Sequence, residues 1–72
     1  MTVQGYRIIA RARCKIYSNY EFVLGYNENA PCKYATWKRN IPDRDCYWGH
    51  YFDDIDKAYA DLYRRALETY EY

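Results

Sequence analysis

Hydrophobic and polar residues alternate along residues 6–17, and this pattern predicts the first long β-strand. One face of that strand would carry Tyr6, Ile8, Ala10, Ala12, Cys14 and Ile16. The other face would carry Arg7, Ile9, Arg11, Arg13, Lys15 and Tyr17. Alternation with a period of two over this length is typical of a strand that has one buried and one solvated face.

A second strand is predicted over residues 21–26, and the same pattern selects its register. A two-residue turn would place Glu21 against the buried Ile16, whereas a three-residue loop places Phe22 there. A slip of one residue moves every side chain to the opposite face, so the apolar pattern favours the longer loop. The expected pairs are Tyr17–Glu21, Ile16–Phe22, Cys14–Leu24 and Ala12–Tyr26.

Two further strands are predicted over residues 33–39 and 46–52. The connection before the first of them contains Asn and Gly, and the one between them contains Pro42-Asp43, which suits the centre of a type I turn. In the last strand Cys46, Trp48, His50 and Phe52 alternate with Tyr47, Gly49 and Tyr51. We expect the first set to face inward because it is the more apolar.

Residues 54–70 are predicted to form one amphipathic helix. Asp53 or Asp54 can cap its N-terminus, and Asp56 in the first turn complements the helix dipole. The spacing predicts a buried stripe of Ile55, Tyr59, Leu62, Ala66 and Tyr70, flanked by Ala58, Tyr63 and Leu67. The solvated side would carry Lys57, Asp61, Arg64, Arg65 and Glu68.

These elements predict a single α+β domain over residues 1–72. Their order is β-β-β-β-α, and the simplest architecture is an antiparallel four-stranded sheet with a C-terminal helix on one face and solvent on the other. A chain of 72 residues has room for one domain. Its 11 tyrosines suit a thin domain, because the tyrosine ring packs while the hydroxyl remains hydrated or finds a partner.

Charge and cysteine content predict a cytoplasmic protein. The net charge is +1, and the three cysteines, Cys14, Cys32 and Cys46, form neither an even set nor a C-x-x-C pair. We expect free thiols, with Cys14 buried as a small hydrophobe. No apolar run approaches the ~20 residues of a membrane span, and residues 1–5 lack the apolar core of a signal peptide.

The sequence predicts no enzymatic activity, no metal site and no cofactor. His50 is the one histidine, and its spacing from Cys46 would place both on one strand face, but a zinc site needs more ligands. Asp53, Asp54 and Asp56 are explained by helix capping rather than by acid–base chemistry. The three glycines form no phosphate-binding loop.

The solvated sheet face is the predicted binding surface. It would combine a row of cations with aromatic rings, namely Arg7, Arg11, Arg13, Lys15, Tyr17, Lys38, Tyr47 and Tyr51, with Val23 and Thr36 among them. Such a surface can bind phosphates and stack bases of DNA or RNA. It can equally dock an acidic patch of another protein, remain an ordinary solvated face, or form a homodimer through its tyrosines.

Two stretches of the sequence carry a resemblance to a known group of proteins. They are residues 22–37, which begin Phe22-Val23-Leu24-Gly25-Tyr26, and residues 47–52, Tyr-Trp-Gly-His-Tyr-Phe. They resemble small proteins without assigned chemistry that prophages and conjugative elements of gut Firmicutes carry. The resemblance implies a mobile-element accessory protein. We therefore expect a non-enzymatic inhibitor that binds a host nucleic-acid-handling defence complex, in the manner of an anti-CRISPR, with direct DNA or RNA binding as the alternative.

Overall fold

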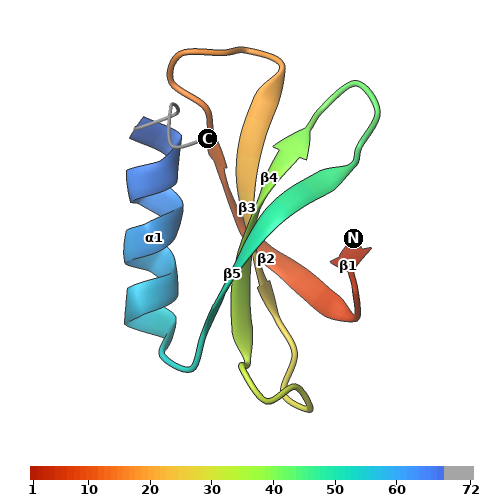
Figure 1. Ribbon diagram of the computed structural model, residues 1–72, viewed down its shortest axis with the longest axis vertical. Helices are drawn as coiled ribbons and strands as arrows, with labels where there is room; N and C mark the ends of the chain where they lie inside the picture. The colour runs from red at the N-terminus through yellow and green to blue at the C-terminus, as the bar shows by residue number, and fades with distance from the viewer. Residues whose placement is uncertain (68–72) are drawn as a thin grey trace.

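A computed structural model describes residues 1–67 and has an α+β fold in which one helix packs on an antiparallel sheet (Figure 1). Its elements are β1 (Thr2–Val3), β2 (Tyr6–Arg13), β3 (Tyr20–Tyr26), β4 (Tyr34–Asn40), β5 (Cys46–Phe52) and α1 (Ile55–Leu67). The strands follow one another across the sheet in the order β1-β2-β3-β4-β5. The predicted fold class is thus confirmed, but the sheet has five strands rather than four.

The additional strand is the short β1, which pairs with the start of β2. Gln4 and Gly5 connect the two strands, and both have positive φ angles, 51° and 86°. A two-residue turn with φ above zero at both positions has the backbone of a type I′ hairpin, which matches the twist of the strands that it joins. The hairpin sets Val3 opposite Tyr6 and Thr2 opposite Arg7.

The register of β2 and β3 differs from the prediction by four residues. Phe22 lies opposite Ala12 rather than Ile16, because β2 ends at Arg13 and the connection to β3 is longer than three residues. Several hydrogen bonds hold this connection; among them, the Lys15 amide donates to the Ala66 carbonyl of the helix, and the Tyr17 amide donates to Cys14 Sγ. Four is an even number, so Ala12 and Phe22 still share a face.

A β-bulge at Ile9 divides β2 into two halves with opposite orientations. Ile8 pairs with Gly25 and Ala10 with the adjacent Leu24, so two residues of β2 advance for one of β3. A bulge of this kind leaves one residue unpaired and breaks the strict alternation of side chains. The predicted face that joined Tyr6 and Ile8 to Ala10 and Ala12 is therefore wrong.

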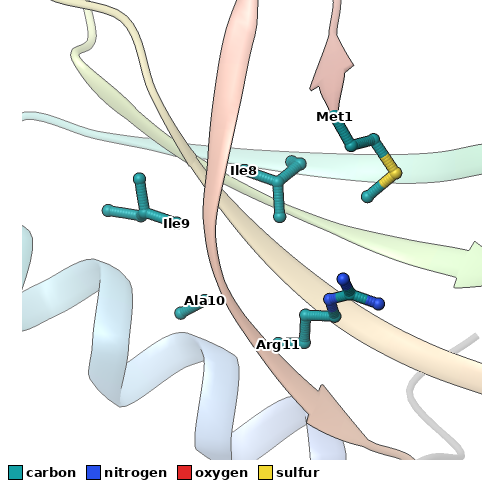
Figure 2. A pocket seen from close by; sticks show the side chains of 5 residues that line it. All are labelled: Met1, Ile8, Ile9, Ala10 and Arg11. Carbon is teal, nitrogen blue, oxygen red and sulfur yellow. The ribbon is translucent and has the colours of Figure 1, made fainter.

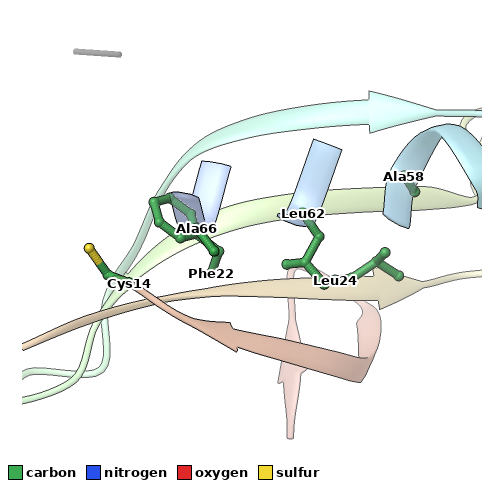
Figure 3. Close-up of a cluster of buried hydrophobic side chains, with 6 residues drawn as sticks. All are labelled: Cys14, Phe22, Leu24, Ala58, Leu62 and Ala66. Carbon is green, nitrogen blue, oxygen red and sulfur yellow. The ribbon is translucent and has the colours of Figure 1, made fainter. Parts of the chain in front are cut away.

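The sheet carries a hydrophobic core on each of its two faces. The helix-side core consists of Cys14, Phe22, Leu24, Ala58, Leu62 and Ala66 (Figure 3). The second core lies on the opposite face and consists of Tyr6, Val23, Ala35 and Trp37, with Glu21 and Arg39 as a buried ion pair at 2.7 Å. This second face was predicted to be solvated, and that prediction is wrong.

Curling of the sheet explains how a second core can form without a second layer. The rings of Tyr6 on β2 and Tyr51 on β5 lie 6.3 Å apart, although β3 and β4 separate these strands in the sheet. Both rings also contact Trp37, at centroid distances of 5.3 and 6.2 Å. Neighbouring strands in a flat sheet are ≈ 4.7–4.9 Å apart, so β2 and β5 must bend toward each other around Trp37.

The helix begins as predicted, and Ala58, Leu62 and Ala66 are buried as expected, but the buried face is rotated so that two charged residues also belong to it. Asp54 caps it, because its Oδ1 accepts the Asp56 amide at 2.9 Å. The buried residues are Ala58, Asp61, Leu62, Arg65 and Ala66, whereas Ile55 and Tyr63 of the predicted apolar face are exposed. Tyr70 and the predicted helix end lie outside the described residues. No helix in residues 1–67 has the length and apolarity to cross a membrane.

Candidate functional site

The four cations predicted to form one row do not share a surface. Arg11 and Arg13 lie opposite Val23 and Glu21, on the face of the second core. The bulge places Arg7, opposite Tyr26, on the other face, and Lys15 belongs to the loop after β2. The predicted basic row assumed that side chains alternate regularly from residue 6 to residue 17, but a bulge interrupts the strand and the strand ends at Arg13.

The predicted aromatic residues are also distributed over several parts of the molecule. Tyr17 is exposed in the loop before β3, where its ring contacts Tyr20, and Tyr51 packs on Trp37 at the second core. Val23 is buried in that core, and Thr36 is buried beneath the helix. Lys38 and Tyr47 pair across β4 and β5, but Lys38 lies opposite Phe22 and is therefore on the helix-side face rather than on the face predicted for the binding surface.

Lys38 and Tyr47 belong to a cluster that we call the aromatic–lysine site. Its members are Tyr20, Lys38, Asn40, Tyr47 and Trp48, which line an open pocket of about 220 Å³. The Lys38 Nζ lies 4.1 Å from the centroid of the Tyr20 ring and 4.9 Å from that of Trp48. Distances of this size allow cation–π attraction, which holds the lysine between the two rings.

Trp48 is the exposed centre of this site, and its backbone is strained. Its φ angle is 55°, and it lies in a second bulge, between the pairs Thr36–His50 and Lys38–Tyr47. The left-handed conformation costs a non-glycine residue about 1–2 kcal/mol. In return the side chain leaves the inward direction that alternation predicts, and 47% of Trp48 is exposed. Strain of this kind is often associated with functional positions.

Arg65 of the helix holds this strained backbone from below. Its Nη2 donates to the Trp48 carbonyl at 2.9 Å, and its Nη1 donates to Oγ1 and the carbonyl of Thr36 at 3.0 and 3.3 Å. The guanidinium also lies 5.2 Å from the Phe22 ring centroid. Arg65 is fully buried, so these contacts replace the hydrogen bonds that water would otherwise make with the guanidinium. The carbonyl beneath the exposed Trp48 is thereby fixed.

Asp61 of the helix connects the sheet to the helix through three side chains. Thr36 Oγ1 donates to Asp61 Oδ2 at 2.6 Å, His50 Nδ1 lies 3.0 Å from the same oxygen, and Arg64 Nη2 donates to Oδ1 at 2.7 Å. Burial alone raises the pKa of Asp61, but the hydrogen bonds from Thr36, Arg64 and His50 outweigh it and lower the pKa below 3.8. The carboxylate is therefore charged at neutral pH.

The Thr36–His50–Asp61 cluster contains the residue types of a nucleophilic triad but connects them differently. In a triad the hydroxyl contacts the histidine, whereas here Thr36 donates to the aspartate itself and is fully buried. Cys46 and His50, predicted to share a face, lie on opposite faces because the Trp48 bulge separates them. Within residues 1–67 no three His, Cys, Asp or Glu side chains gather as a metal site.

Acidic residues lie close to the aromatic–lysine site. Loss of solvent contact, followed by the carboxylates of Asp43 and Asp45, raises the pKa of the Tyr47 hydroxyl. Negative charge beside Tyr47 offsets the positive charge of Lys38, so the surface around Trp48 is mixed in sign. Such a surface suits a protein partner better than a chain of phosphates, which needs clustered cations.

Comparison of the chain with models of protein families, with curated proteins and with solved structures gave no match.

Proposed function

We propose that the protein acts by binding, without catalysis of its own, and that it inhibits a host complex which handles nucleic acids. The aromatic–lysine site is the contact surface in this proposal. The class of partner follows from the sequence resemblance to proteins of prophages and conjugative elements, since accessory proteins of mobile elements often block host defence. The inhibitor would act stoichiometrically, as an anti-CRISPR does.

The exposed ring of Trp48 is the observation that carries this proposal. Tryptophan is enriched among the few residues that dominate the energy of protein interfaces, and such residues bind best when they are fixed in advance. The Trp48 carbonyl is bonded to the buried Arg65, and its ring is in contact with Lys38. A partner would therefore meet a largely ordered surface and lose little conformational entropy on binding.

A protein surface is the preferred target because the exposed rings of the aromatic–lysine site lie apart from Arg11 and Arg13, which share their face with the exposed Tyr51. Arg11 and Arg13 lie on the face of the second core, while Trp48 and Tyr47 accompany a single lysine and two acidic neighbours. A nucleic-acid surface combines several cations with stacking rings on one face. Direct binding of DNA or RNA remains the alternative function, and it has its own arm in the test below.

The test uses purified defence nucleases, namely a guide-loaded CRISPR nuclease and a restriction enzyme from the host. We expect the protein to block DNA cleavage at a 1:1 molar ratio for one of them. Replacement of Trp48 by glycine (Trp48→Gly) removes the ring and suits the left-handed backbone, so the fold is retained. Loss of a central interface residue costs about 2 kcal/mol or more, which corresponds to at least ~30-fold weaker binding.

Tyr63→Ala is the matched control, because Tyr63 is an exposed ring on the helix that lies outside the site. It should inhibit as well as the unmodified chain does. Full activity of Trp48→Gly, or no inhibition of either nuclease by the unmodified chain, would count against the proposal. Micromolar binding of labelled single- or double-stranded DNA or RNA that weakens steeply with salt would favour the alternative function.

A further inference from the structure

One edge of the sheet is incompletely covered along β2. The outer neighbour β1 pairs only with Tyr6 and Arg7, and beyond them the Ile8 amide donates to the Met1 carbonyl at 3.0 Å. At the far end the Lys15 amide donates to Ala66. Between these closed ends, no other strand of residues 1–67 borders the outer side of β2.

The backbone groups of Arg11 and Arg13 point toward this open edge. The Cys14 amide donates to the Tyr20 carbonyl, which directs residue 14 toward β3, and successive residues of a strand alternate between its two edges. Arg13 and Arg11 therefore turn outward, each with one N–H donor and one C=O acceptor. A strand laid along this edge would find four backbone hydrogen-bonding groups.

A pocket lies at the end of the open edge where β1 stops. It has a volume of about 500 Å³ and is lined by Met1, Ile8, Ile9, Ala10 and Arg11 (Figure 2). Figure 2 shows Met1, Ile8 and Arg11 on one side of β2, with Ile9 and Ala10 on the other. Side chains of an added strand would thus meet apolar groups on one side and a mixture of apolar groups and arginine on the other.

We propose that this edge binds an extended acidic segment of another protein by β-strand addition. Arg11 and Arg13 are exposed and share a face, and neither has an ion pair among residues 1–67. Alternate residues of an added strand would lie beside them, so carboxylates at every second position of that strand would neutralise the two guanidinium groups. Main-chain hydrogen bonds provide affinity in this mode, and alternate side chains provide specificity.

The same two arginines disfavour a second copy of the chain as the occupant. A symmetric dimer through this edge would be isologous and antiparallel, with Arg11 opposite Arg11 or Arg13 of the other copy. Like charges directly opposite each other destabilise a strand pair. Pairing with a second copy of the chain is therefore disfavoured, and pairing with a strand that carries acidic side chains is favoured.

The test is a titration of the full chain with a synthetic seven-residue peptide, blocked at both ends, in which glutamate alternates with valine. We expect hydrogen exchange at the Arg11 and Arg13 amides to slow at least tenfold at saturation, as followed by NMR. A peptide with lysine in place of glutamate should bind at least tenfold more weakly. A peptide N-methylated at the pairing amides should lose affinity to the same extent, because it keeps the charge but lacks the donors.

Two protein variants complete the test. Arg11→Ala with Arg13→Ala should weaken binding at least tenfold, whereas Arg7→Ala, which removes an exposed cation from the covered part of β2, should not. Glu68→Gln with Glu71→Gln should leave the affinity unchanged; a large gain would assign the edge to the chain's own carboxylates and overturn the proposal. Equal binding of the N-methylated peptide, or a dimer in sedimentation that excludes the peptide, would overturn it as well.

The aromatic–lysine site plays no part in this binding, so the two proposals fail separately. Trp48→Gly should bind the peptide normally even where it no longer inhibits a nuclease. Conversely, the Arg11 and Arg13 variants that no longer bind the peptide should still inhibit the nuclease, because inhibition depends on Trp48.

Discussion

Single buried polar residues determine how the helix is seated on the sheet. Asp61 and Arg65 occupy positions that helical periodicity assigns to solvent, yet both are buried. Each is satisfied by groups of the sheet: Asp61 by Thr36 and His50, and Arg65 by Thr36 and the Trp48 carbonyl. Buried charges persist only where such partners exist, so these contacts fix the rotation of the helix about its axis.

Replacement of Asp61 by asparagine should lower the free energy of unfolding by about 2–3 kcal/mol at pH 7, the range for a charged hydrogen-bonding group that loses its partners. The folded-state pKa of Asp61 is below 3.8, so its stabilising effect is present above that value and is lost as the pH falls through the folded-state pKa. The difference between the unmodified chain and Asp61→Asn should therefore shrink on acidification below about pH 4. Urea unfolding at a series of pH values measures it.

Asp53→Asn is the control for this measurement, because Asp53 is an exposed carboxylate at the start of the helix. It should change stability by less than about 0.5 kcal/mol at every pH. A loss in Asp61→Asn that stays constant down to pH 2 would show that shape rather than charge underlies the contribution of Asp61.

At the level of elements, the sequence predicts the strands and the helix well but the faces less well. Burial alternates along residues 6–13 as predicted, although the bulge moves the less exposed side chains from one face of the sheet to the other, and Asp54 caps the helix as predicted. The two bulges explain the wrong faces within β2 and β5, since each reverses the faces of the residues beyond it in its strand. Neither bulge contains a glycine in the left-handed conformation, which would have been a sequence signal for it. At the second bulge Trp48 itself adopts that conformation.

The strand β3 passes unusually close to its neighbours at Gly25. A Cβ atom there would lie 2.8 Å from Tyr6 Cβ and 3.1 Å from Trp37 Cζ3. Glycine normally weakens a strand, so alanine would stabilise β3 if space allowed. We expect the opposite: Gly25→Ala should lower the free energy of unfolding by about 1–3 kcal/mol, the usual cost of overpacking.

Chemical denaturation followed by circular dichroism gives the sign of this effect. A more stable Gly25→Ala variant would show that β2 can withdraw from β3 and that the contact with Tyr6 is loose.

At the scale of the whole molecule, one sheet serves two cores. β3 lies at the centre of this arrangement, because Phe22 and Leu24 face the helix while Val23 faces the second core. A domain of this size ordinarily buries only about 60% of the surface of its unfolded chain. Curling around Trp37 lets the face without a helix bury residues as well.

The ion pair of Glu21 and Arg39 makes the second core sensitive to single substitutions. Both residues are buried, and Arg39 Nη1 donates to Glu21 Oε2 at 2.7 Å. Arg39→Met would leave Glu21 buried without its partner and should cost about 3–5 kcal/mol. The double variant with Glu21→Leu should recover most of this loss, since an apolar pair of similar volume has no charge to desolvate.

Urea unfolding of the two single variants and the double variant gives the coupling between the residues. Losses that simply add would mean that the two side chains stabilise the fold independently.

The candidate site was only partly predictable for the same reason as the second core. Lys38 and Tyr47 were predicted as binding residues, but on the face away from the helix, whereas the structure places them on the helix-side face. Tyr20 joins them through the register of β3 and β4, and Trp48 joins them through a bulge. The second core depends on Tyr6 meeting Tyr51 and Trp37, three residues that local periodicity cannot bring together. Long-range curvature is a property of the whole sheet and is not encoded in any one segment.

The two tryptophans provide natural optical probes of two separate events. Trp37 is 1% exposed and Trp48 is 47% exposed. Emission from Trp37 should be shielded from dissolved quenchers and should change only when the second core opens, whereas emission from Trp48 should respond to whatever covers the aromatic–lysine site. Quencher accessibility would thus separate docking from unfolding in unlabelled protein, with Trp48→Gly isolating the buried signal.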